Sequence, residues 1–205
     1  VFEHELSLAA LWEDILDRDT WLTILTKFIY TNHQTKTDPI TGKITTTSQI
    51  RFPRFHQWRA VSKIANAAAV EGPGNNYLIQ HSAGSGKTKT IAWMAHRAGR
   101  FIDASGKPIF DSVIVVTDRT VLDDNIKEGL DLLRASEGLV VNVDNELGSK
   151  SKTLEAALSR GGHIISCTIQ TFPALAKMME KSPALSGRNY CVIMDEAHSS
   201  QHGEA

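Results

Sequence analysis

A loop of small residues in the first half of the chain has the composition of a phosphate-binding site. The loop runs from His81 to Thr88, with the sequence HSAGSGKT. Small side chains let the backbone N–H groups of a loop close around phosphate oxygens, and the positive end of a following helix adds to the attraction. We predict that the phosphates of a nucleotide are held by Ala83, Gly84, Ser85, Gly86, Lys87 and Thr88.

The last two residues of this loop carry its chemistry. The ammonium of Lys87 reaches the β- and γ-phosphates in such loops, and the hydroxyl of Thr88 ligates Mg²⁺. The pattern departs from the usual P-loop at one position, because His81 stands where the first glycine is expected. The alternative interpretation is a glycine-rich turn from a strand to a helix with a surface lysine. A serine hydrolase is excluded, since neither Ser82 nor Ser85 has glycines two residues away on both sides.

Two adjacent acids near the end of the sequence provide the second half of a phosphoryl-transfer site. Asp195 and Glu196 follow the apolar run CVIM and begin the sequence DEAH. A buried strand that ends in two acids delivers them to the edge of a sheet. We predict that Asp195 holds Mg²⁺ through water and that Glu196 orients and deprotonates the attacking water, while His198 relays the nucleotide state. The alternative is an exposed acidic turn.

The elements that must position these residues are visible as short apolar runs between amphipathic stretches. The runs occupy residues 77–80, 112–117, 139–143, 163–168 and 190–195. Strands that alternate with helices form a parallel sheet covered by helices on both faces. Ligands of such sheets bind where strands end and helices begin. The sequence therefore predicts an α/β fold that brings the loop and the two acids to one side.

The first part of the chain has a different pattern. Apolar residues at 21–29 fall on one helical face after a cap at Asp19 or Thr20, and a shorter helical pattern precedes them. The Thr-rich stretch 31–50 contains the turn signal DPITG and forms either an exposed hairpin or a loose connector. A further helix is predicted at 55–70, where apolar residues recur at helical spacing until EGPGNN stops it.

Composition and charge narrow the class of protein. A chain of 205 residues with 41% hydrophobic content is long enough for one substantial core. The 22 Lys and Arg residues nearly balance the 23 Asp and Glu residues, so any contact with nucleic acid must be local. We expect no membrane helix and no signal peptide. Cys167 and Cys191 lie in apolar runs and are predicted to be buried thiols, which fits a reducing cytoplasm.

The phosphate loop and the DEAH sequence together resemble the first RecA-like domain of superfamily 2 helicases and translocases. The segments VVTDRTVLDDN, TIQTF and DEAHSSQ are most similar in sequence to the motor subunit of type I restriction enzymes. The resemblance implies a P-loop NTPase domain of the RecA-like kind at residues 51–205, with a helical linker segment at 1–50. The sequence ends soon after His198, so we expect a second RecA-like domain, with its catalytic arginines, elsewhere in the protein.

The same resemblance assigns roles to residues outside the loop. The segment RFPRFHQWRAV resembles an adenine-sensing motif, in which Gln57 pairs with the adenine edge through its amide and Arg54 stacks or contacts phosphate. Hydroxyl, Arg and backbone N–H groups are typical of phosphate contacts. The residues expected to contact the DNA backbone follow strand ends: Thr117, Arg119, Thr168 and Thr171. Each of these alone is better explained as a turn or cap residue, and only the set together favours a DNA track. Ser199 stands where the family often has Arg.

Three classes of function remain open from the sequence. The leading hypothesis is an ATP-driven translocase of duplex DNA that uses Mg²⁺ and serves restriction in the cytoplasm, together with methylase and specificity subunits. The second is another P-loop ATPase or helicase, such as a small-molecule kinase or a transporter ATPase. The third is a non-catalytic scaffold that docks nuclease and methylase partners. We expect this chain alone to bind ATP and to turn it over slowly.

Overall fold

The structure of the chain is a computed structural model that describes residues 11–39, 41–117, 140–143, 155, 158, 159 and 164–195. The chain divides into two compact units, Val1–Trp58 and Arg59–Ala205. The division lies a few residues after the boundary predicted at residue 50, and that boundary stays a prediction. Among the described residues, no helix combines the length and the apolar character that crossing a membrane requires.

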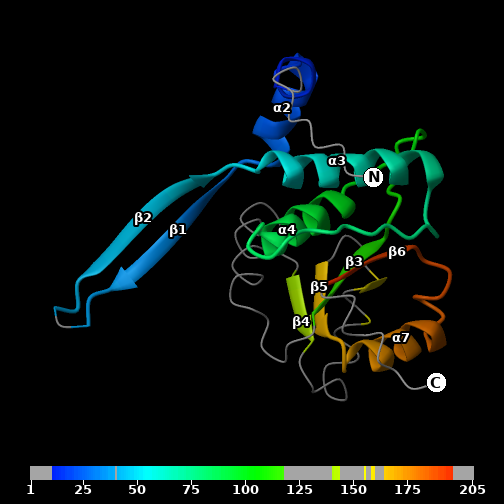
Figure 1. Cartoon of the computed structure of the whole chain (residues 1–205). Coiled ribbons are helices and arrows are strands. Elements are labelled where there is room, and N and C mark those ends of the chain that lie inside the picture. Colours follow the sequence, from blue (N-terminus) through cyan, green and yellow to red (C-terminus); the bar gives the residue numbers. More distant parts are fainter. Residues whose placement is uncertain are drawn as a thin grey trace. The chain divides into compact units, whose positions relative to one another are not determined.

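Two short helices open the described part of the first unit (Figure 1). They are the π-helix η1 (Leu11–Ile15) and the α-helix α2 (Arg18–Lys27). The carboxylate of Asp17 accepts hydrogen bonds from the backbone N–H groups of Asp19 and Thr20, at 3.1 and 3.0 Å. Asp17 is therefore the N-cap, and the predicted cap at Asp19 or Thr20 was wrong. The helix begins before its apolar pattern does, so the cap lies further upstream.

A two-stranded antiparallel ribbon follows, and it resolves the choice between hairpin and loose connector. Strand β1 (Tyr30–Thr37) pairs with strand β2 (Ile44–Arg51) over its whole length. β-Branched threonines favour this extended backbone. The turn between the strands uses Gly42 at a φ of 66°, and the Gly42 N–H donates to the Asp38 carbonyl at 2.9 Å. The DPITG signal thus marks the turn of an exposed hairpin.

Helix α3 (Phe55–Glu71) confirms the helix predicted at 55–70. Its buried apolar residues Val61, Ala65 and Ala68 follow helical spacing. The helix ends where Gly72 adopts a φ of 73°, a conformation that only glycine enters without strain. The division between the two units falls within this helix, after Trp58.

The second unit is built on a four-stranded sheet with the order β4-β5-β3-β6. Every pair in the described sheet is parallel. The strands are β3 (Ser112–Thr117), β4 (Val140–Val143), β5 (Ile164–Thr168) and β6 (Tyr190–Met194). Four of the five predicted runs are therefore strands, and the predicted parallel α/β sheet is confirmed.

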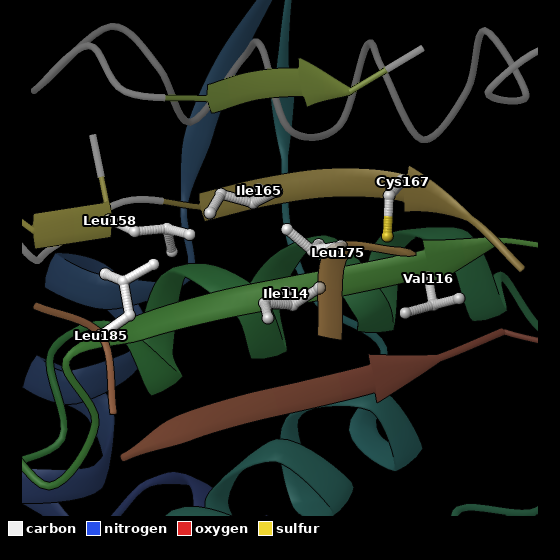
Figure 2. Packing of buried hydrophobic residues seen from close by; sticks show 7 residues of the cluster. All are labelled: Ile114, Val116, Leu158, Ile165, Cys167, Leu175 and Leu185. Carbon is white, nitrogen blue, oxygen red and sulfur yellow. The ribbon is translucent and has the colours of Figure 1, made fainter. Parts of the chain in front are cut away.

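Helices cover both faces of this sheet (Figure 1). On one face, the core packs against helix α7 (Phe172–Lys181). The buried cluster consists of Ile114, Val116, Leu158, Ile165, Cys167, Leu175 and Leu185 (Figure 2). On the other face lies helix α4 (Lys87–Ala98). The residue after it, Gly99, comes close to Val113, whose side chain points away from that of Ile114.

The fifth predicted strand, at 77–80, is absent. This segment has no strand assignment, and Leu78 is 86% exposed. The apolar content of YLIQ is sufficient for a strand, but a strand also needs a neighbouring edge with which to exchange hydrogen bonds. No described strand pairs with it. The sequence of the segment does not show whether such an edge is available. The prediction was therefore wrong because strand formation depends on pairing in the tertiary structure.

Candidate nucleotide-binding site

The loop at 81–87 bends through two glycines. Gly84 has a φ of 73°, and Gly86 has a φ of 86° and a ψ of 40°. Both values lie in the left-handed region, which costs residues with a Cβ about 1–2 kcal/mol. The Ser85 N–H donates to the Ser82 carbonyl at 3.3 Å, which closes the turn between them. The two glycines are therefore required by the path of the backbone as well as by the space that a phosphate needs.

The loop leads directly into the N-terminus of α4. Gly86 is the N-cap, and Lys87 is the first residue of the helix. The N–H groups of Lys89 and Thr90 donate to the Gly86 carbonyl at 3.0 and 3.2 Å. A glycine N-cap contributes no side-chain acceptor to the first turn, in contrast to the Ser, Thr or Asp that usually occupies this position. A helix that begins this way presents its positive end to an anion.

The second part of the site is positioned by strand β6. Its parallel pairing with β3 runs from Ser112 opposite Tyr190 to Val116 opposite Met194. Just beyond the ladder, the Asp195 N–H donates to the Val116 carbonyl at 2.9 Å. Asp195 is thereby held at the carboxyl end of the sheet, on the side where the sequence placed the ligand.

A cavity of about 750 Å³ brings the two halves together, because Lys87 and Asp195 both line it. One wall is a single face of α4, formed by Lys87, Thr90, Ile91 and Met94. The opposite walls come from β6 and from the segment 72–81. The volume lies in the range of ligand-binding clefts. The other predicted loop residues, 83–86 and Thr88, do not line this cavity.

Thr90 and Tyr77 line the cavity and were not among the predicted site residues. Thr90 is 3% exposed, and its hydroxyl donates to the Gly86 carbonyl at 3.5 Å. Tyr77 donates its hydroxyl hydrogen to Glu71 at 2.7 Å. A signal for Thr90 was available, because it lies three residues after Lys87 and thus on the same helical face. No comparable signal exists for Tyr77, which enters the cavity wall through the path of a loop.

The predicted adenine contact, Gln57, has a role in the structure of its own helix. Its side chain is 2% exposed, and its Oε1 accepts the N–H of Arg54 at 2.9 Å. Gln57 is the third residue of α3 and Arg54 precedes the helix, so this is the reciprocal half of a capping box. The interaction fixes the start of α3. Recognition of adenine by Gln57 and a phosphate or stacking role for Arg54 stay predictions.

The predicted DNA contacts in the described residues are buried. Thr117, Thr168 and Thr171 are 3%, 7% and 5% exposed. The hydroxyls of Thr168 and Thr171 lie 2.9 Å apart and hydrogen-bond to each other. The Thr117 hydroxyl has no hydrogen-bond partner within the described part of the chain. DNA contact by these residues stays a prediction, and Arg119 and Glu196 lie outside the described residues.

Both cysteines are free thiols, as the sequence predicted. Cys167 in β5 is 1% exposed, which confirms the predicted burial, whereas Cys191 in the edge strand β6 is partly exposed, so its predicted burial was wrong. Burial raises the pKa of each thiol to about 11, because the thiolate loses hydration in the protein interior. Neither residue is therefore a thiolate nucleophile near neutral pH.

Nucleotide-binding α/β domains combine a parallel sheet, a glycine at the N-terminus of a helix and a cavity between them, and this chain has all three. The comparison with protein families agrees with this class. The model of the SWI2/SNF2 ATPase family matches residues 56–205. The chain therefore belongs to the SWI2/SNF2 ATPase family.

Similarity to a curated relative gives a finer comparison than the family model. The chain is 31% identical over 162 residues to the type I restriction enzyme HindI endonuclease subunit of Haemophilus influenzae. The aligned region covers 75% of this chain and 14% of that subunit, so the chain spans a small part of the relative's length. No solved structure matches the chain. The predicted likeness to superfamily 2 motors and to type I restriction subunits is confirmed at this level.

Proposed function

We propose that this chain is the ATP-binding part of a DNA translocase that serves a type I restriction enzyme. The observation that supports the proposal is the shared cavity, because the loop lysine Lys87 and the strand-end acid Asp195 both line it. Membership in an ATPase family supports ATP as the nucleotide. The parallel sheet supports a P-loop domain of the RecA-like kind as the fold of residues 51–205.

The residues of the loop fit a triphosphate with Mg²⁺. Left-handed glycines and a helix N-terminus without a side-chain cap suit a bound anion. Lys87 would pair with the β- and γ-phosphates, and Thr88 and Asp195 would hold the metal, which neutralises charge on the transferred phosphoryl group. Glu196, next to Asp195, would orient and deprotonate the attacking water.

Action on DNA is the finer part of the proposal. The HindI relative is a restriction enzyme endonuclease subunit, and this chain matches 14% of its length. We extend from it to duplex DNA as the track, to methylase and specificity subunits as partners, and to the cytoplasm as the location. Another P-loop ATPase and a docking scaffold are the alternatives, and they differ from the proposal in whether DNA stimulates hydrolysis.

The test is a steady-state ATPase assay of the full-length subunit with and without linear duplex DNA. We expect DNA to stimulate hydrolysis, and Glu196→Gln to slow it by roughly 10² or more while ATP still binds. An equal rate of hydrolysis with and without DNA would favour a different P-loop ATPase. The Glu196→Gln variant also tests the scaffold alternative. If this variant no longer hydrolyses ATP but still assembles with its partners and still supports restriction, the chain is a scaffold.

A further inference from the structure

One buried hydroxyl group at the carboxyl end of the parallel sheet has no hydrogen-bond partner. Thr117 ends strand β3 and is 3% exposed, yet its Oγ1 bonds to no atom in the described part of the chain. A buried hydroxyl without a partner has lost its hydrogen bonds to water, so it destabilises the fold. A valine would fill a similar space without that cost. The hydroxyl of Thr117 therefore needs an explanation other than packing.

The alternation of side chains along β3 places Thr117 on the face of the sheet that α4 covers. Ile114 and Val116 belong to the buried cluster on the α7 side (Figure 2). Successive side chains of a strand point to opposite faces, so Val113 and Thr117 point to the other side. On that side, Val113 comes close to Gly99 at the end of α4. Thr117 thus shares a face with the helix that follows the phosphate loop.

The register of the strands puts an acid next to Thr117. In the parallel pairing of β3 and β6, Val116 lies opposite Met194. The Asp195 N–H continues this ladder to the Val116 carbonyl at 2.9 Å. The next residues in the same row are therefore Thr117 and Asp195. Neighbouring strands lie about 4.8 Å apart, so two short side chains on one face are within reach of a hydrogen bond.

The neighbour of Thr117 on its other side already has a partner. Thr168 of β5 lies opposite Thr117, and the hydroxyls of Thr168 and Thr171 hydrogen-bond to each other at 2.9 Å. The Thr171 N–H also donates to the Thr168 hydroxyl at 3.3 Å. A carboxylate has about four lone-pair sites, so Asp195 can accept a hydrogen bond from Thr117 in addition to its other contacts.

We propose that Thr117 is a positioning residue for Asp195, whose carboxylate accepts a hydrogen bond from the Thr117 hydroxyl when Mg²⁺ and ATP are bound. Groups that hydrogen-bond to a metal-holding carboxylate fix its orientation. The inference rests on the proposed function, because it takes Asp195 to hold the metal. It gives Thr117 a role in the nucleotide site, in place of the contact with DNA that the sequence predicted.

The test measures the affinity of the 205-residue chain for ATP by calorimetry, once with Mg²⁺ and once with a chelator. The ratio of the two affinities reports what the metal contributes to binding. Thr117→Val removes the hydroxyl and keeps the branched shape of the side chain, whereas Thr117→Ser keeps the hydroxyl. Asp195→Ala, alone and combined with Thr117→Val, completes a double-mutant cycle. Circular dichroism establishes that each variant is folded.

Ser166 provides a matched control. Its hydroxyl is also buried and has no partner in the described residues, and strand alternation puts it on the same face as Thr117. The residues in its row are Asn142, Val115 and Ile193, and none of them is an acid. Ser166→Ala therefore removes a buried hydroxyl of the same kind at a distance from the proposed metal site.

We expect Thr117→Val to reduce the gain in affinity from Mg²⁺ by about tenfold, and Thr117→Ser to restore most of it. Affinity for ATP without metal should stay unchanged. In the Asp195→Ala background, Thr117→Val should have no further effect, because its partner is gone. The midpoint of thermal unfolding without ligand should not fall in Thr117→Val or in Ser166→Ala, since each loses only a hydroxyl without a partner.

An Mg²⁺ ratio in Thr117→Val equal to that of the parent, or an equal loss in Ser166→Ala, would overturn the inference and leave the proposed function intact. A parent that gains no affinity from Mg²⁺ would contradict the metal role of Asp195 and the inference with it. If Thr117→Val loses affinity for duplex DNA in an anisotropy assay while its Mg²⁺ ratio is unchanged, Thr117 contacts DNA and does not position Asp195.

Discussion

The middle and the edge of the parallel sheet have the same backbone geometry but different surroundings. Every residue of β3 and β5 is buried. In β6, at the edge of the described sheet, Val192 and Met194 are 43% and 41% exposed. The segment 77–80, which the sequence predicts as a strand, is also exposed and pairs with no described strand.

This difference separates stability from ligand binding. Residues of β3 and β5 pack against helices on both faces and gain about 1.5–3 kcal/mol for each large apolar side chain that is buried. The edge gives up part of that gain, and the cavity with Lys87 and Asp195 lies there. A variant in the middle should therefore change stability alone, and a variant at the edge should change binding alone.

The largest effect is expected in the middle. Leu175 of α7 is completely buried against the β3–β5 core. Leu175→Ala removes three carbon atoms and leaves a cavity, so it should lower the free energy of unfolding by about 2–5 kcal/mol. Urea denaturation measures this, with Lys177→Ala on the exposed side of α7 as the control. A loss below about 1 kcal/mol would show that the core is not close-packed.

The next effect is expected at the edge and in binding. Lys87→Ala removes a charge-assisted contact with phosphate and should weaken ATP binding by about 2 kcal/mol, or roughly 30-fold. Stability should stay within about 0.5 kcal/mol of the parent. Calorimetric titration with ATP measures the affinity, and Lys89→Ala, exposed on the same helix, serves as the control. An unchanged affinity of Lys87→Ala for ATP would show that the loop does not bind the phosphates.

Alanine substitutions at the two glycines that flank α4 should change the free energy of unfolding in opposite directions. Gly86→Ala forces a Cβ into the left-handed region and should cost about 1–2 kcal/mol. Gly99 has a helical φ of −64°, and a Cβ there would meet its neighbours at 3.7 and 3.8 Å. Gly99→Ala should therefore stabilise the protein by about 0.4–1 kcal/mol. Thermal unfolding of both variants tests the prediction, and equal signs would contradict it.

The smallest effect concerns the two thiols. Cys191 at the edge is more exposed than Cys167 in the middle, so a thiol reagent should modify Cys191 first. Both reactions should accelerate roughly tenfold per pH unit until the raised pKa of about 11 is reached. Because folding raises both pKa values, it favours the protonated thiols, and stability should fall as pH rises from about 9 to 11. Reaction of Cys167 first would reverse the assignment of middle and edge.

The sequence by itself determined the local elements and the chemistry that they carry. Glycines at 84 and 86 were predictable as backbone requirements, and both have a positive φ. The apolar runs at 112–117 and 163–168 became buried parallel strands, because continuous apolar character is what burial on both faces selects. The helix at 55–70 followed from its spacing, and the DPITG turn followed from its residue types.

Only the tertiary structure decided which groups meet. The sequence predicted that Lys87 and Asp195 lie on the same side of the sheet, but whether they share one cavity depends on the order of the strands, which no local pattern contains. The tertiary structure also decided that the segment YLIQ does not pair with a described strand, although its residues favour a strand. It likewise decided that one face of β6 is half exposed. Burial and strand pairing are made between segments far apart in the chain, so propensity within one segment cannot specify them.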